Sequence, residues 1–254
     1  VKECTGIFMN KSGHTRHFYL LCLAARSAAF VFLVAYALIA PERFDTDLAA
    51  PLGRITPLSV VWLLLMLSMA VRLFPSKSES LGCQKEFARR FRPTGLLPSS
   101  QEIHHANRGA AVVLAVWIAS NAVVFGLHFQ GWLSQRAMVC LAGFYGVCDI
   151  VCILFFCPFQ AWMMHNRCCT TCRIYDWDYP MMCTPLVVIP CFYAWSLVAL
   201  AVVLALQWEI TYRRHPERFF ESSNQALRCA ACQEQLCAYK RRLRQKNQEK
   251  RLSE

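Results

Sequence analysis

The chain has 254 residues, of which 56% are hydrophobic and only 17% are charged, and its formal net charge is +11. This composition excludes an ordinary soluble domain, because several apolar runs reach the roughly 20 residues that a helix needs to cross a bilayer. The runs are solid and not alternating, which also excludes the strands of a membrane barrel. The sequence therefore predicts an all-α integral protein that crosses the cell membrane several times.

Five apolar runs are candidate spans of a helical bundle that covers residues 1–208. They lie at about 18–40, 56–74, 109–129, 137–160 and 184–208. The first run could instead be a cleaved signal ending at Ala35-Tyr36-Ala37, but it is longer than the 7–15 residues of a signal core, so a retained span is favoured. Arg26 lies within this run, and we expect its long side chain to extend to the lipid head groups.

The connection after the second run predicts a helix on the membrane surface. Residues 78–91 mix apolar and basic side chains, which is typical of a helix lying in the membrane interface. Ser76 with Glu79 forms a capping box at its start. A second capping box, Ser99 with Glu102, leads into the third span.

The basic residues are unevenly distributed and predict the sidedness of the connections. The stretch 75–108 carries six Lys and Arg residues, so we expect it to be cytoplasmic. The connections 41–55 and 130–136 suit the outer side. The C-terminal tail, 209–254, contains cysteines and is strongly basic, which indicates a cytoplasmic or lipid-facing segment; no nucleic-acid partner is expected.

These expectations conflict when the spans are counted. If the N-terminus is cytoplasmic, five full spans would place 161–183 on the cytoplasmic side and the basic tail on the outer side of the membrane. The fifth run contains Pro185 and Pro190 in its first half, where proline breaks helical pairing. That run could be re-entrant or kinked, so the sequence leaves open four or five spans and the side of the tail.

Fifteen cysteines include two C-x-x-C pairs, Cys169 with Cys172 and Cys229 with Cys232. Two thiolate pairs at this spacing can complete a tetrahedral metal site. The candidate ligands are Cys83, Cys168, Cys169, Cys172, Cys229, Cys232 and Cys237. Zinc and iron both accept thiolates, and dithiol redox chemistry without a metal is the third possibility. The pattern predicts a cysteine-rich cap near one membrane surface.

Polar residues within the spans are further candidates. Asp149 lies near the middle of the fourth run, where an ionisable side chain indicates an ion or proton path. The alternative is a structural hydrogen bond from Asp149 to Asn121, which is also in mid-span. The aromatic residues that follow the fourth run suit an interfacial belt. They are Trp162, Tyr175, Trp177 and Tyr179. No histidine pair lies at matched depth for a haem.

Three stretches together carry a resemblance. They are PSKSES-x-GCQK at 75–85, NRCC-x-TCRIY-x-WD at 166–178, and the C-terminal CxxC-x4-C. The chain resembles a group of uncharacterised bacterial multi-pass membrane proteins, seen mainly in anaerobes. The resemblance implies no known activity and no catalytic residues. An anaerobic setting would favour an oxygen-sensitive cluster over zinc.

The favoured function is a membrane-embedded metal-thiolate protein, holding an iron–sulfur cluster or zinc, that exchanges electrons with a redox partner or quinone. One alternative is a membrane scaffold or binding protein in which zinc fixes the tail. The other is an ion or small-molecule transporter that uses Asp149.

Overall fold

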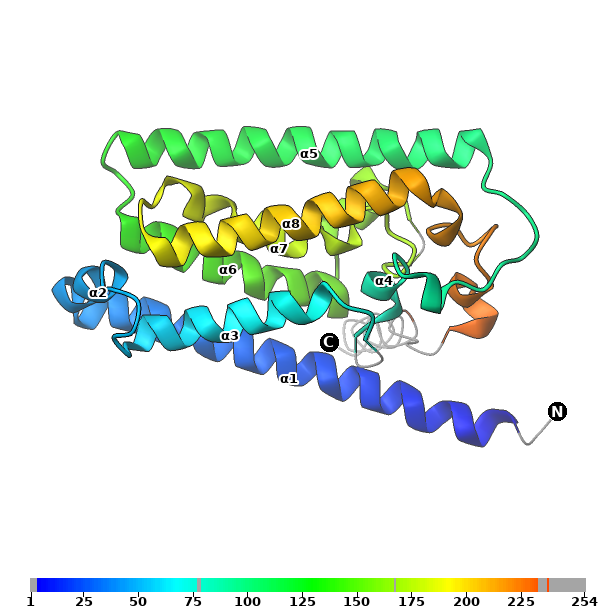
Figure 1. Ribbon diagram of the computed structural model, residues 1–254, viewed down its shortest axis with the longest axis horizontal. Coiled ribbons are helices and arrows are strands. Elements are labelled where there is room, and N and C mark those ends of the chain that lie inside the picture. The colour runs from blue at the N-terminus through cyan, green and yellow to red at the C-terminus, as the bar shows by residue number, and fades with distance from the viewer. Residues whose placement is uncertain (1–3, 77–78, 167, 233–236, 238–254) are drawn as a thin grey trace, which may run out of the picture.

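The computed structural model describes residues 4–76, 79–166, 168–232 and 237, with side chains from His17 onward (Figure 1). Four of its helices are long and apolar enough to cross a membrane. They are residues His17–Ile39 of α1 (Cys4–Ile39), α5 (Ser100–Phe129), α6 (Gln135–Leu154) and α8 (Phe192–Arg214). A multi-pass helical membrane protein is thus confirmed, while the second predicted run forms the shorter apolar helix α3 (Pro57–Arg72).

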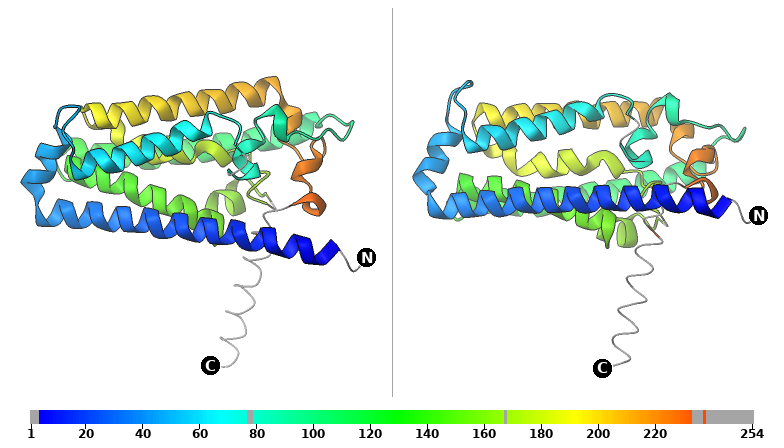
Figure 2. Two further views of the ribbon diagram at one scale, coloured as in Figure 1. Left: turned by 60° about the horizontal axis from the view of Figure 1, so that its bottom comes forward. Right: turned by 90° about the horizontal axis from the view of Figure 1, so that it is seen from below.

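The long helices lie along one axis, with α1 and α5 at opposite edges (Figure 1). α1 packs mainly on α6, and α3 packs on α8. Three segments gather at one end of the bundle, 79–99, 155–177 and 215–232, and we call this the loop end (Figure 2). The opposite end holds α2 (Pro41–Leu48) and the turn between α5 and α6.

Short helical turns make up most of the loop end. They are α4 (Leu81–Gln84), η1 (Ala88–Arg90), η2 (Phe159–Met163), η3 (Tyr175–Trp177), η5 (Pro216–Arg218), η6 (Gln225–Leu227) and η7 (Cys229–Ala231). An isolated antiparallel bridge between Pro93 and Asn224 joins two of the segments.

Hydroxyl side chains start three helices of the bundle, α3, α5 and α6. The predicted capping box of Ser99 and Glu102 is confirmed at the start of α5. A reciprocal pair that sequence reasoning missed, Thr56 and Ser59, starts α3. Ser134 caps α6 alone, accepting from the backbone N–H of Ala137 at 3.2 Å. Each cap satisfies backbone donors that a helix start leaves without partners.

An additional pass through the bundle lies between α6 and α8 (Figures 1 and 2). It consists of α7 (Asp178–Cys183) and the 3₁₀ turns of η4 (Thr184–Val188). The pass begins at the loop end, where Asp178 binds Arg72. It finishes at the opposite end, where the hydroxyl of Tyr193, at the start of α8, donates to the carbonyl of Pro51 at 3.3 Å. The 3₁₀ rise of about 2 Å per residue lets so short a segment cover this length.

The predicted run 184–208 is therefore not one continuous span. Pro185 lies in 3₁₀ structure, Pro190 precedes a break, and the helix that crosses the membrane begins at Phe192. Protein covers most of the pass, because Tyr179, Met182 and Ile189 are part of the core, while Val187 is 49% exposed. Irregular backbone is tolerated at membrane depth only where protein covers it.

The extra pass resolves the conflict in the count of spans. It returns the chain so that α8 ends at the loop end, beside the segment that follows α6. The Trp208 Nε1 donates to the carbonyl of Arg173 at 2.9 Å, and Arg173 forms an ion pair with Glu209. Both C-x-x-C segments consequently lie at the same end of the bundle, and we still predict that this end is cytoplasmic.

The surface helix expected at 78–91 is wrong. Residues 77 and 78 lie outside the described residues, and beyond them only the four residues of α4 and the three of η1 are helical. Phe87 is extended between them, with ψ at 135°. Gln84, Lys85 and Glu86 are buried under the rest of the loop end instead of facing lipid head groups. Contacts with distant segments thus override the local pattern.

The expected aromatic belt is only partly present. Trp162 is 67% exposed, as a belt residue would be. Tyr179 is buried in the bundle, and Tyr175 and Trp177 pack against the cluster of Trp208, Tyr212 and Phe219. Two of the four aromatic residues therefore hold the loop end together, and a third lies inside the bundle.

Candidate functional site

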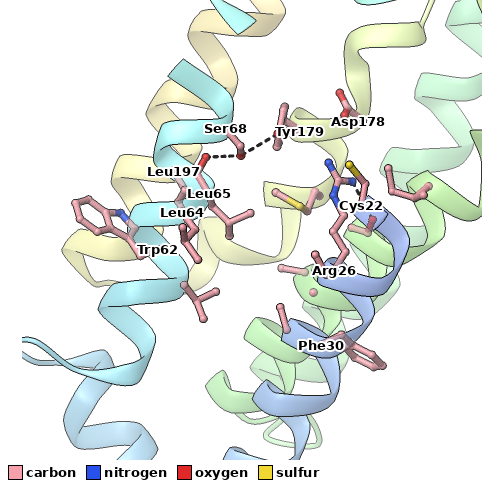
Figure 3. A pocket seen from close by; sticks show the side chains of 18 of the residues that line it. Cys22, Arg26, Phe30, Trp62, Leu64, Leu65, Ser68, Asp178, Tyr179 and Leu197 are labelled. Atoms are coloured by element: carbon pink, nitrogen blue, oxygen red, sulfur yellow. Dashed lines mark hydrogen bonds between the residues drawn. The ribbon is translucent and has the colours of Figure 1, made fainter. Parts of the chain in front are cut away.

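A cavity of about 490 Å³ lies within the bundle, between α1 and α3 on one side and α6, α7, η4 and α8 on the other (Figure 3). Most of its wall is apolar. The apolar lining includes Leu33, Trp62, Leu65, Met182, Leu186 and Leu197. This size and this character are typical of a site for a small organic ligand.

The cavity reaches the lipid-facing surface between α1 and α3. Three of its lining residues are well exposed, Phe18 of α1 at 42%, Leu64 of α3 at 63% and Val71 of α3 at 48%. Since α1 packs on α6 while α3 packs on α8, these two apolar helices form the rim of the cavity. The cavity is therefore open at the surface of the bundle between them.

One end of the cavity is lined by charged side chains, and we call it the inner end. Arg26 is the first of them. Its Nη1 donates to Asp149 Oδ2 at 2.8 Å and to the carbonyl of Gly146 at 2.9 Å. The expectation that Arg26 extends to the lipid head groups is wrong, because the carboxylate on α6 draws it inward. The alternative bond from Asp149 to Asn121 is also wrong: among the described residues Asp149 accepts from Arg26, whereas Asn121 bonds to Trp117 and Tyr145.

Arg72, at the C-terminal end of α3, is the second charged residue of the inner end. Its Nη1 donates to Asp176 at 2.8 Å and to Asp178 at 2.6 Å, and Glu79 lies 3.9 Å from its Nε. Burial raises the pKa of Asp176 to about 7, against the opposing effect of Arg72.

Tyr179 contacts both guanidinium groups. The Arg72 guanidinium carbon lies 4.5 Å from the centre of its ring, and that of Arg26 lies 5.7 Å away. The Tyr179 hydroxyl donates to Ser68 Oγ at 2.9 Å (Figure 3). Cation–π contacts of this kind add to the attraction between the charges and fix the ring.

Two thiols complete the inner end, Cys22 on α1 and Cys83 on α4. Cys22 lies beside Arg26 in Figure 3. Cys83 is 4% exposed, and the Ser80 hydroxyl donates to its sulfur at 3.5 Å. Burial raises the pKa of Cys83 well above its usual value, so this side chain is a neutral thiol.

The predicted metal ligands lie in turns of similar form. The backbone N–H of Cys172 donates to the carbonyl of Cys169 at 2.9 Å, and that of Cys232 donates to the carbonyl of Cys229 at 3.3 Å. Such a turn brings the two cysteines of a C-x-x-C pair to one side. The Cys169 thiol donates to Gln160 Oε1 at 2.8 Å.

The structure does not bring these thiols together. Among the described residues, no three Cys, His, Asp or Glu side chains are placed to hold one metal ion. Cys172 is buried in an apolar cluster with Ala110 and Val113, whereas Cys83 faces the cavity. Cys229 and Cys237 are exposed, and Cys168 and Cys232 are partly exposed.

Lys85 ties the three segments of the loop end together. It is fully buried, and its Nζ donates to the carbonyls of Thr170 at 2.9 Å and Cys172 at 2.7 Å. The rings of Trp208 and Phe219 lie 5.3 Å and 5.6 Å from the same atom. Burial lowers the pKa of Lys85 to about 8.

Sequence reasoning missed most of the charged end of the cavity. It selected Asp149 but not the residues around Arg72, namely Glu79, Asp176 and Asp178. An available indication was that an Arg and an Asp occupy mid-span positions of two different runs, where opposite charges are expected to pair.

No protein-family model, curated protein or solved structure matches this chain. Its chemistry must therefore be derived from its own geometry. An apolar cavity open to lipid, with hydrogen-bond donors and carboxylates at one end, can bind a molecule that has an apolar chain and a polar head.

Proposed function

We propose that this protein binds a membrane-dissolved amphiphile in the cavity between α1 and α3. The apolar chain lies along the wall formed by Trp62, Leu65 and Leu197, and the polar head meets Arg26 and Arg72. The observation that carries the proposal is the combination of an opening toward lipid with a charged inner end.

The energetics favour an amphiphile over a purely polar ligand. A purely polar ligand would find no hydrogen-bond partners along the apolar wall of Trp62, Leu65 and Leu197, and burying polar groups there is costly. A purely apolar lipid, in contrast, would leave the buried guanidinium donors without acceptors, which is costly. Only a ligand with both parts satisfies the whole cavity.

Purification in a mild detergent tests this proposal. We expect the protein to retain one amphiphile, measured by solvent extraction and mass spectrometry. Leu65→Trp places a bulky ring in the cavity and should release the ligand. Leu67→Trp is the matched control, because Leu67 lies on the same helix, is 55% exposed and does not line the cavity. Equal ligand content in both variants would contradict the proposal.

A second candidate function is the metal-thiolate centre expected from the sequence. It is supported by the position of both C-x-x-C turns at the loop end. In this candidate the tail closes onto the first turn and forms a cysteine-rich cap. An iron–sulfur cluster or zinc is held by four members of the predicted set, Cys83, Cys168, Cys169, Cys172, Cys229, Cys232 and Cys237.

Anaerobic purification separates the forms of this candidate. Stoichiometric iron with a broad visible absorption that bleaches on reduction would support electron transfer to a redox partner or quinone. Stoichiometric zinc with no visible absorption would support the scaffold. Absence of both metals from protein that still carries its amphiphile would contradict this second candidate.

A further inference from the structure

We infer that the amphiphile is an isoprenoid quinone, whose flat, uncharged head ring lies at the charged end of the cavity against Arg26 and Arg72. This inference rests on the proposed function, and it names the class of ligand. Three properties of the inner end lead to it: its charge balance, the positions of its donors, and the presence of acceptors beside those donors.

The charge balance disfavours an anionic head. Two guanidinium groups, Arg26 and Arg72, face four carboxyl groups. These are Glu79, Asp149, Asp176 and Asp178. Both arginines are already neutralised by close ion pairs, so a phosphate or carboxylate head would be repelled by the carboxylates more than it is attracted. An uncharged head avoids this cost.

The donors suit a ring with carbonyl groups on opposite sides. Towards the described residues, Arg26 and Arg72 each donate hydrogen bonds through Nη1. A guanidinium has five N–H donors, so the Nη2 donors of both arginines and the Nε donor of Arg26 are available to a ligand, while Nε of Arg72 faces Glu79. Both guanidinium groups lie over the Tyr179 ring, which is 4% exposed, so the ligand head lies against the arginines and not on this ring, and each of its carbonyl groups accepts from one arginine.

The acceptors distinguish a quinone from an uncharged glycerolipid. Asp178 and Glu79 line the cavity next to the arginines. A hydroquinone has two hydroxyl donors where the quinone has two carbonyl acceptors, and these carboxylates can accept from them. One site therefore satisfies both the quinone and the hydroquinone head. The ester groups of a glycerolipid only accept hydrogen bonds, so they would not bind the carboxylates. The thiols of Cys22 and Cys83 lie in the same part of the wall.

Photolabelling tests the inference. A benzoquinone that carries an azide on its ring and a ten-carbon chain is irradiated with the detergent-purified protein, and labelled peptides are identified by mass spectrometry. We expect labelling within 18–30 and 176–184, reduced at least tenfold by excess unmodified quinone. Leu65→Trp should abolish labelling and Leu67→Trp should not. Arg26→Gln should weaken it, with ligand-induced thermal stabilisation as a second measurement.

Competing lipids separate this inference from the function on which it rests. If diacylglycerol or phosphatidylglycerol blocks Leu65-dependent binding and the unmodified quinone does not, the quinone inference is overturned while the amphiphile site stands. If no amphiphile is retained and labelling is not saturable in the wild-type protein, both fall. Saturable labelling at the two predicted peptides, competed by quinone alone, supports both.

Discussion

Arg26 and Asp149 form an ion pair of 2.8 Å that joins α1 to α6 within the membrane-spanning part of the bundle. Each of the two side chains is about one-fifth exposed. The pair explains how two charged residues can be placed in apolar spans, since each neutralises the other. It also holds α1 in place at one wall of the cavity.

Replacing one partner of this pair should destabilise the protein more than replacing both. Asp149→Leu leaves the Arg26 charge without its partner, and we expect a loss of about 3–5 kcal/mol in the free energy of unfolding. The double variant Arg26→Met, Asp149→Leu should recover most of that loss. Unfolding in mixed detergent micelles measures both. A double variant as unstable as the single one would show that the pair is not the reason for the loss.

Stability should rise with pH above pH 8 because of Lys85. Its pKa is about 8 in the folded protein and 10.5 in the reference state, so between these values the unfolded chain binds more protons. Stability therefore increases with pH in this window. A pKa difference of about 2.5 corresponds to about 3 kcal/mol. The measurement is the wild-type stability minus that of Lys85→Met, from pH 7 to pH 10.5.

Glu86 should act in the opposite direction at lower pH. Burial raises its pKa from 4.5 to about 8, so the folded protein binds more protons than the unfolded chain between these values. Stability should fall as pH rises through this window. Glu86→Gln keeps a hydrogen-bonding side chain and should flatten the curve below pH 8 without changing the rise above it. A curve unchanged by this substitution would contradict the assignment.

The additional pass predicts that both cysteine segments label from one side of the membrane. Cys229 is exposed at the loop end, and a membrane-impermeant maleimide should reach it from the cytoplasmic side only. Leu52→Cys lies at the opposite end on a residue that is 64% exposed, and it should label from the other side only. Peptide mapping identifies the labelled thiol. Labelling of Cys229 and Cys168 from different sides would exclude the pass.

The pair of Arg173 and Glu209 should hold the first C-x-x-C segment to α8. Arg173 stacks 3.6 Å from the centre of the Tyr212 ring, and Glu209 also accepts from Trp177 Nε1 at 3.0 Å. Glu209→Gln should cost about 2 kcal/mol, because charge-assisted hydrogen bonds are lost. We also expect faster labelling of Cys172, which is 6% exposed in the folded protein.

An exposed ion pair provides the matched control for this substitution. Arg136 and Asp45 are 3.5 Å apart, and Asp45 is 56% exposed. Asp45→Asn should change stability by less than about 1 kcal/mol, as is usual for solvated pairs. A comparable loss in both variants would mean that burial of Arg173 is not what makes its pair important.

The sequence was sufficient to predict the helical spans, because a long, solidly apolar run can satisfy its backbone hydrogen bonds in lipid only as a helix. It was also sufficient for the capping box of Ser99 and Glu102, which depends on residues three positions apart. The start of the last span was missed, although Pro185 and Pro190 indicated a break there. Hydropathy alone does not distinguish a segment covered by protein from one covered by lipid.

The candidate site was less predictable, since it depends on contacts between distant segments. Asp149 was selected for its depth, but its partner Arg26 is 123 positions away. Lys85 was assigned to a membrane surface because its neighbours are basic and apolar, whereas carbonyls of the 170–172 turn and three aromatic rings draw it inward. Such pairings follow from tertiary packing, which local patterns do not encode.

The pass formed by α7 and η4 has a consequence for how the protein is made. A segment this short and interrupted by proline cannot be stable in lipid on its own, because its backbone groups would lack partners. It cannot be inserted during synthesis as an independent span. Its two ends lie at opposite ends of the bundle, so the segment must cross together with α8, and it becomes stable there only when α6 and α8 pack around it. The cavity wall at Tyr179 and Met182 therefore depends on this packing.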